Sequence, residues 1–257
     1  MRDAGTPRRH RRSPRGAGPL AATAGVLGEL LVTLACLLGA YAVWQTWWTS
    51  VGAVHQASQR LEHFREGTAG GPHGSAVLRT DDPPVAPPVA EGETIGVLVV
   101  PRWEGLTRNA MPVVEGTSRE VLDAAAAGRY PTSQQVGEVG NVALAGHRRT
   151  YGDSFRHVDA LRPGDPVVIE TASTWYVYVV TGHEIVLPSQ WEVVAPVPHH
   201  PGTPPTERLL TLTTCHSPSF GEYGNSHRWV VHARFLGWLD RAEGTPPQLA
   251  GSGGDAG

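Results

Sequence analysis

Residues 209–215 read Leu-Leu-Thr-Leu-Thr-Thr-Cys and alternate between apolar and polar side chains with the two-residue period of a half-buried β-strand. In such a strand Leu210 and Leu212 share one face, and Thr211, Thr213 and Cys215 share the other. The thiol of Cys215 therefore leaves the strand on its polar side. Residues 216–227 (HSPSFGEYGNSH) have the composition of a loop, and the next long strand begins at Arg228. If the loop folds back as a hairpin, Arg228 returns beside Cys215.

Further strand signals surround this pair and extend over residues 93–240. Short β-like runs separated by turn residues occur at 94–100, 106–114, 141–145, 166–171, 174–186, 208–214 and 228–239. Helical signals are few: one predicts a helix from Thr117 or Ser118 to Ala127, and another a short turn before Leu161. A mostly β fold is therefore expected, a closed or nearly closed β-barrel of seven to eight strands with a few short helices.

Only two cysteines occur among the 257 residues, and the other one, Cys36, lies in an apolar run near the N-terminus. If Cys36 is in a bilayer and Cys215 outside it, the two cannot pair, and Cys215 is a free thiol in an oxidising compartment. A nucleophile would explain such a thiol. The alternative is a buried cysteine that serves as a small apolar residue.

The apolar run from Val26 to Trp44 contains one formal charge, Glu29, and its 19 residues are long enough to cross a bilayer. Six arginines and one aspartate precede it in residues 1–16, a local charge of +5, which predicts a cytoplasmic N-terminus and an extracellular remainder. The alternative is a cleaved signal peptide, because residues 40–42 read Ala-Tyr-Ala.

Composition divides the chain into five parts. We expect a basic cytoplasmic arm (1–20), a single-pass transmembrane anchor (21–48), a stalk with a Pro- and Gly-rich spacer (49–92), a β-domain (93–240) and a disordered tail (241–257). The overall net charge of −3 argues against nucleic acid as a partner. The apolar run makes the cytoplasmic membrane an expected partner.

A polar residue also follows the run 141–145, where the chain continues Gly-His-Arg-Arg-Thr-Tyr-Gly. An apolar strand that ends in Gly146-His147 places the imidazole at a rim, where it can titrate near neutral pH. His147 is one of 12 histidines, so spacing alone does not select it.

Taken together, VALAGHRRTYGDSF (142–155), the segment HVDALRPGD (157–165), the sequence LTLTTC (210–215) and RWVVHA (228–233) resemble the sortases, membrane-anchored cysteine transpeptidases of Gram-positive bacteria. The resemblance covers about residues 93–239 and is greatest to the class E type. It implies a sortase-like catalytic domain in which Cys215 is the nucleophile, His147 the general acid and base, and Arg228 the oxyanion stabiliser.

The resemblance also implies the partners. The substrates would be surface proteins with a C-terminal sorting signal, LAxTG-like and cut between Thr and Gly, and the acyl acceptor a peptidoglycan precursor amine. Candidate substrate-binding residues flank the catalytic ones in sequence: Thr150, Tyr151, Thr213, Thr214 and Tyr223. No cofactor and no metal are expected.

Three other interpretations stay open. The residue types of Cys215, His216, His227 and His232 would suit zinc, although their spacing does not match that of structural sites. A second interpretation is a non-catalytic, membrane-tethered β-domain that binds a surface partner. A third is a pilin-polymerising sortase.

Overall fold

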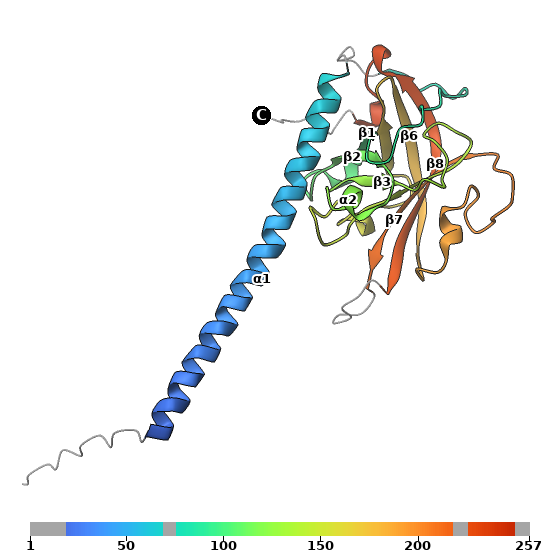
Figure 1. Ribbon diagram of the computed structural model, residues 1–257. Coiled ribbons are helices and arrows are strands. Elements are labelled where there is room, and N and C mark those ends of the chain that lie inside the picture. The colour runs from blue at the N-terminus through green and yellow to red at the C-terminus, as the bar shows by residue number, and fades with distance from the viewer. Residues whose placement is uncertain (1–18, 69–75, 218–225, 250–257) are drawn as a thin grey trace, which may run out of the picture. The chain divides into compact units, whose positions relative to one another are not determined.

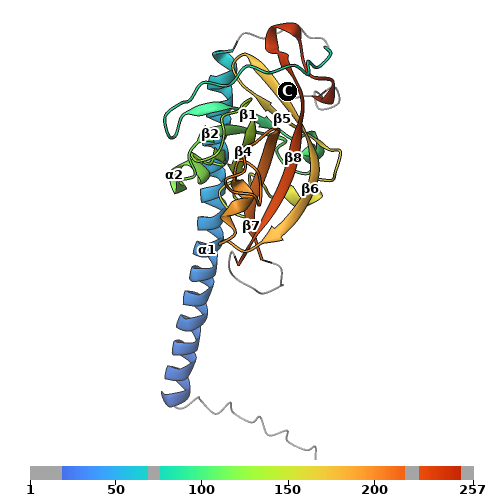
Figure 2. The same ribbon diagram turned by 90° about the vertical axis from the view of Figure 1, so that its right-hand side faces the viewer.

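The computed structural model describes residues 19–68, 76–217 and 226–249. Within these residues, eight strands close into a barrel in the order β1-β2-β3-β4-β7-β8-β6-β5 (Figures 1 and 2). The strands are Thr94–Val99 (β1), Ala110–Glu115 (β2), Ala127–Arg129 (β3), Gly140–Ala145 (β4), Pro166–Glu170 (β5), Thr174–Val186 (β6), Arg208–His216 (β7) and His227–Asp240 (β8). Neighbouring strands are antiparallel except β2 with β3 and β4 with β7. The expected closed β-barrel is thus confirmed.

The interior of the barrel holds the main hydrophobic core. Leu210 and Leu212 of β7 are fully buried in it, together with Val231 and Ala233 of the neighbouring β8. This burial follows the alternation in the sequence, and it leaves the side chains of the intervening residues on the outer face of the sheet.

The helices of the β-domain are shorter than the sequence predicts. Only Arg119–Leu122 (α2) is helical where we expected a helix as far as Ala127, and the alanines that follow lead into β3. Alanine favours helices, but β3 pairs with both β2 and β4, and these ladders override a local preference. The remaining helices are single 3₁₀ turns at Pro101–Trp103, Val158–Ala160, Trp191–Val194, Arg241–Glu243 and Pro247–Leu249.

The N-terminal part of the described chain is one long helix, Pro19–Glu66 (α1). Of the described residues, only this helix is long and apolar enough to cross a membrane, and its apolar side chains between Val26 and Val43 are exposed. Contacts divide the chain into two units, residues 1–46 and 47–257. The helix is a candidate membrane anchor, while its orientation stays a prediction. The basic arm lies mostly outside the described residues.

The Pro-rich segment before β1 is not a free spacer over residues 76–92. The Tyr176 hydroxyl donates to the carbonyl of Pro84 (2.7 Å), and the Trp238 indole donates to that of Asp81 (3.1 Å). Ala86 is buried in the barrel core. The segment needs no core of its own because its carbonyls satisfy polar groups of the barrel aromatics. The expected disordered tail likewise packs onto the barrel as far as Leu249.

Candidate functional site

Cys215 lies near the end of β7 and is half-buried. Because Leu210 and Leu212 point into the core, the thiol is on the outer face of the barrel. Cys36 is exposed on α1, and both cysteines are free. The sequence prediction that the two do not pair is confirmed.

Arg228 lies directly opposite Cys215. The antiparallel ladder of β7 and β8 pairs Cys215 with Arg228 and, one step further out, His216 with His227. Side chains of directly opposed residues lie on the same face of a sheet, so the guanidinium and the thiol share the outer face. The prediction that the ends of this loop meet is therefore confirmed.

His147 emerges at the same end of the sheet because β4 runs parallel to β7. The N–H of Gly146 donates to the Thr213 carbonyl (3.2 Å), and the Thr214 hydroxyl donates to the Gly146 carbonyl (2.7 Å). Gly146 is followed in the chain by His147, and Thr214 is followed by Cys215. His147, Cys215 and Arg228 thus lie at the same end of the sheet, at one rim of the barrel.

The backbone that carries His147 is held by close packing. A Cβ at Gly146 would lie 2.8 Å from Cγ of Phe155, whose ring is buried in the core. The Phe155 N–H also donates to the His147 carbonyl (2.8 Å). Glycine is required at this position because only a residue without a side chain lets the Phe155 ring approach so closely.

One side chain at this rim was missed by the sequence analysis. Asp123, directly after α2, places Oδ1 2.7 Å from Nε2 of His147, and the two side chains are 27% and 25% exposed. The bond makes Nε2 the protonated nitrogen of the neutral ring and leaves Nδ1 as its base. Asp123 precedes His147 by 24 residues, and no spacing rule links the two.

Tyr151 is the predicted substrate-binding residue that contacts this group. Its ring stacks on His147 with centroids 5.3 Å apart and an interplanar angle of 29°. Behind it lies a small cluster formed by Ala53 and Ala57 of α1 with Ala125. Tyr151 thus joins the imidazole to the part of α1 that belongs to the same unit as the barrel.

The other predicted substrate-binding residues differ in position. Thr150 is exposed in the turn after His147. Thr213 and Thr214 are 3% exposed, and their hydroxyls are bonded within the protein, to Tyr130 and to the Gly146 carbonyl. These two threonines connect β7 to its surroundings, and a contact with substrate stays a prediction for all three. Tyr223 lies outside the described residues.

His216, next to the thiol, is a second imidazole at the rim. Burial and the positive charge of Arg148 lower the pKa of His216 below its ordinary value. An Nη1–H of Arg148 donates to Nδ1 of His216 (2.6 Å), and Arg148 also pairs with Asp159 (3.2 Å). A neutral ring with this lone pair occupied is a poor proton carrier, so His147 is the better candidate.

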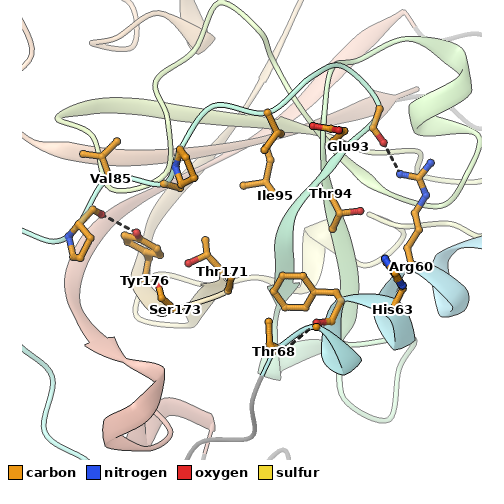
Figure 3. A pocket seen from close by; sticks show the side chains of 18 of the residues that line it. Arg60, His63, Thr68, Val85, Glu93, Thr94, Ile95, Thr171, Ser173 and Tyr176 are labelled. Carbon is orange, nitrogen blue, oxygen red and sulfur yellow. Dashed lines mark hydrogen bonds between the residues drawn. The ribbon is translucent and has the colours of Figure 1, made fainter.

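A large cavity of about 1000 Å³ lies elsewhere in the same unit (Figure 3). Its walls come from the end of α1, from the segment 84–95 and from residues 171–176. Arg60 of α1 donates to the Gly92 carbonyl across one side of it (2.9 Å). None of the predicted site residues lines this cavity.

The zinc set considered from the sequence is brought together only in part, since Cys215, His216 and His227 lie at neighbouring positions of the β7–β8 ladder but His232 does not. His232 pairs with Thr211, four residues before Cys215 in β7, and its ring is bonded to Glu184 instead. The thiol thus has His147 and Arg228 at the same end of the sheet. In such a group a thiol can act as a nucleophile, an imidazole as a proton carrier and a guanidinium as a fixed cation, the three functions that an acyl transfer to sulfur requires.

Comparisons with known proteins identify the family of this chain. Residues 98–236 match the model of the sortase domain. The chain is 35% identical over 260 residues to sortase SrtE2 of Streptomyces coelicolor, covering 95% of this chain and 94% of that protein. It is 32% identical over 248 residues to sortase SrtE1 of the same organism, covering 93% of this chain but only 65% of that protein.

Solved structures agree. The SrtA sortase from Actinomyces oris superposes with a TM-score of 0.64 at 59% identity, over 67% of this chain and 96% of that one. Sortase E1 from Streptomyces coelicolor, solved with a tripeptide in its active site, gives a TM-score of 0.54 at 32% identity, over 62% of this chain and 99% of that one. The chain therefore belongs to the sortase family, and within it is similar to the class E members.

Proposed function

We propose that the protein is a cysteine transpeptidase that cuts a C-terminal sorting signal and transfers the new carboxyl end to an amine. One observation carries the proposal: the barrel brings Cys215, His147 and Arg228 to one rim through the β4–β7 and β7–β8 pairings. A thiol without such neighbours would be a poor nucleophile, whereas a thiolate beside an imidazolium is a strong one.

In the first half of the reaction, the Cys215 thiolate attacks the carbonyl carbon of the scissile peptide bond. The electron pair of that carbonyl moves onto oxygen, where the Arg228 guanidinium stabilises the negative charge. When the tetrahedral intermediate collapses, the C–N bond breaks and the His147 imidazolium protonates the departing amine. The product is a thioester between Cys215 and the substrate protein.

In the second half, the acceptor amine attacks the thioester carbonyl and gives its proton to His147. Collapse breaks the C–S bond, forms the new amide and returns the thiolate. Asp123 takes part by holding the ring, since its bond to Nε2 leaves Nδ1 for proton exchange in both halves. The Tyr151 ring restricts the imidazole from its other side.

Family membership and the geometry of the site support a proposal for the substrate class. We propose an LAxTG-like signal, cut between Thr and Gly, on exported surface proteins, with a peptidoglycan precursor amine as the acceptor. The tripeptide in the active site of sortase E1 supports a peptide substrate at the corresponding rim. With α1 as a single-pass anchor and the N-terminus cytoplasmic, the β-domain would face both reactants outside the cell.

The test uses the full chain in detergent micelles with an LAxTG peptide and a short peptide amine, and mass spectrometry of the products. We expect the transfer product, and a thioester adduct on the protein when the amine is left out. Cys215→Ala abolishes both. Arg228→Ala lowers the rate by about 10²–10³-fold, the effect typical of one lost oxyanion donor.

Arg149→Ala is the matched control for Arg228→Ala, because it removes an exposed arginine from the same end of the sheet. It should keep most of the activity. Equal losses in the two arginine variants would mean that net charge matters rather than a directed guanidinium. Cleavage that survives Cys215→Ala would end the proposal.

A further inference from the structure

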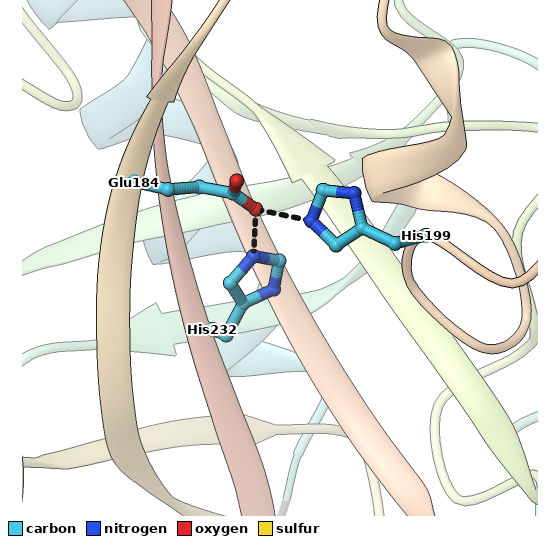
Figure 4. A group of neighbouring side chains, drawn as sticks. All are labelled: Glu184, His199 and His232. Atoms are coloured by element: carbon cyan, nitrogen blue, oxygen red, sulfur yellow. Dashed lines mark hydrogen bonds and ion pairs between the residues drawn. The ribbon is translucent and has the colours of Figure 1, made fainter.

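We propose that Glu184, His199 and His232 form a binding site for one Zn²⁺ ion on the outer face of the barrel (Figure 4). Their three donor atoms lie within 4.8 Å of one another. Nε2 of His232 is 2.7 Å and Nε2 of His199 is 2.6 Å from the same carboxylate oxygen, Oε1 of Glu184. This site is separate from the thiol and revises the expectation that the protein holds no metal.

A buried chain of hydrogen bonds determines which nitrogen of His232 is free. The amide nitrogen of Asn141 faces the carbonyls of Val193 (3.5 Å) and Ala195 (3.0 Å), which orients the amide. Its oxygen therefore accepts the single hydroxyl proton of Thr211 (2.9 Å). The Thr211 oxygen can then only accept from Nδ1–H of His232, which is 3.3 Å away.

These hydrogen bonds leave a lone pair on Nε2 of the neutral His232 ring. Since a lone pair cannot face a carboxylate oxygen at 2.7 Å without a positive charge between them, either a proton or a metal ion must occupy that position. Metal-binding histidines usually donate their other N–H to a fixed partner, as His232 does through Thr211. Asn141 and Thr211 are both 0% exposed, so this support is rigid.

The donor set favours a transition-metal ion, and Zn²⁺ is the one that we propose. Two imidazoles and one carboxylate, with the fourth position open to water, are ligands that Zn²⁺ accepts in tetrahedral geometry. Ca²⁺ and Mg²⁺ prefer all-oxygen sites. The three side chains are 24–41% exposed, so an ion can reach them. For a zinc ion at ~2.0–2.1 Å from each atom, the two Nε2 atoms must move from 2.6 and 2.7 Å to about 3.3 Å from Oε1 of Glu184, a small side-chain rotation.

The three ligands come from different elements. Glu184 is on β6, His232 is on β8, and His199 is in the connection between β6 and β7. The backbone of His199 is in the left-handed region (φ 62°), which residues other than glycine adopt where the surroundings impose it. A bound ion would therefore tie this connection to the two strands that it covers.

The proposed zinc site lies on the same strand as Arg228. Arg228 and His232 are four residues apart on β8 and share its outer face, which places their Cα atoms about 13 Å apart. Val230, between them, packs against Val193 of the β6–β7 connection. Zinc would thus fix the connection that borders Arg228.

Binding is tested on the full chain in detergent, purified without a polyhistidine tag. Cys215→Ala serves as the background, so that the thiol cannot hold the metal. After chelation and dialysis, zinc is titrated in competition with a chromophoric chelator, and bound metal is measured by elemental analysis. We expect one equivalent, and binding weaker by more than about 100-fold in His199→Ala. Thr211→Val, which removes only the support of His232, should weaken binding by about 10–100-fold.

His200→Ala is the matched control, because it removes an exposed histidine from the next position of the same connection. It should keep the full equivalent. Melting curves without metal show whether each variant is folded, and zinc should raise the Tm of the His200→Ala protein but not of the His199→Ala protein. Absence of bound zinc, or equal binding by these two variants, would overturn the proposal and leave a proton between His232 and Glu184.

Discussion

Replacement of Asp123 tests the geometry at the rim most directly. Asp123 accepts a hydrogen bond from Nε2 of His147 at 2.7 Å. Asp123→Ala removes this partner, and the ring then loses both its orientation and the nearby negative charge that favours the imidazolium. Asp123→Asn keeps an oxygen that can accept the bond but removes the charge. The two variants therefore separate orientation from electrostatics.

The size of the effect follows from the contact. A hydrogen bond to a charged group contributes about 1.5–3 kcal/mol, and each 1.36 kcal/mol corresponds to about tenfold in rate. Because the Asp123 and His147 side chains are 27% and 25% exposed, water screens part of the interaction and the lower half of the range applies. We expect kcat/KM to fall by about 10–50-fold in Asp123→Ala and by less in Asp123→Asn.

The assay is the peptide transfer reaction with the full chain in detergent, followed across pH. The profile of Asp123→Ala is compared with that of Asp123→Asn, which keeps an acceptor for the ring but not the charge. Glu120→Gln is the matched control, because it removes one exposed carboxylate from α2. Activity of Asp123→Ala within twofold of wild type, or an equal loss in Glu120→Gln, would refute a positioning role for Asp123.

Three further predictions concern stability and pH. Gly146→Ala places a methyl group 2.8 Å from the Phe155 ring and should destabilise the fold by about 1–3 kcal/mol, seen as a lower Tm; an unchanged Tm would mean that the ring moves freely. Arg129→Ala breaks a buried pair with Glu115 (2.7 Å) and should cost about 3–5 kcal/mol in denaturant unfolding, whereas Arg156→Ala, which removes a 58% exposed arginine, should cost about 1 kcal/mol or less. Burial and the charge of Arg148 lower the pKa of His216 in the folded protein, so the unfolded chain binds more protons below about pH 6.5 and acid destabilises the fold. The Tm of His216→Gln should therefore fall less than that of wild type between pH 7.5 and 5.5. An equal fall in the two proteins would contradict this prediction.

The strands were predictable because their signal is local. The bounds of β6 match the predicted run at residues 174–186, and β7 and β8 differ from prediction by one or two residues at their ends. Alternation with period two reflects backbone geometry that each strand carries by itself. The hairpin that brings Arg228 to Cys215 is also a local feature of two strands adjacent in sequence.

Errors arose where distant contacts override local preference. Residues 124–127 read as helix because alanine favours it, yet residues 127–129 form β3 between two other strands. Residues 76–92 read as a spacer because they are rich in proline, yet the barrel supplies Tyr176 and Trp238 as partners for their carbonyls. Neither partner can be recognised within the segment itself.

The sequence by itself determined the strand periodicity and the apolar run long enough for an anchor, and its resemblance to the sortases selected Cys215, His147 and Arg228 as the candidate catalytic residues. Only the tertiary structure decided that Asp123 holds His147 and that His232 joins Glu184 and His199 rather than Cys215. The physical reason is barrel closure: it sets side chains tens of residues apart within a few ångströms of one another, and no local pattern encodes which of them meet.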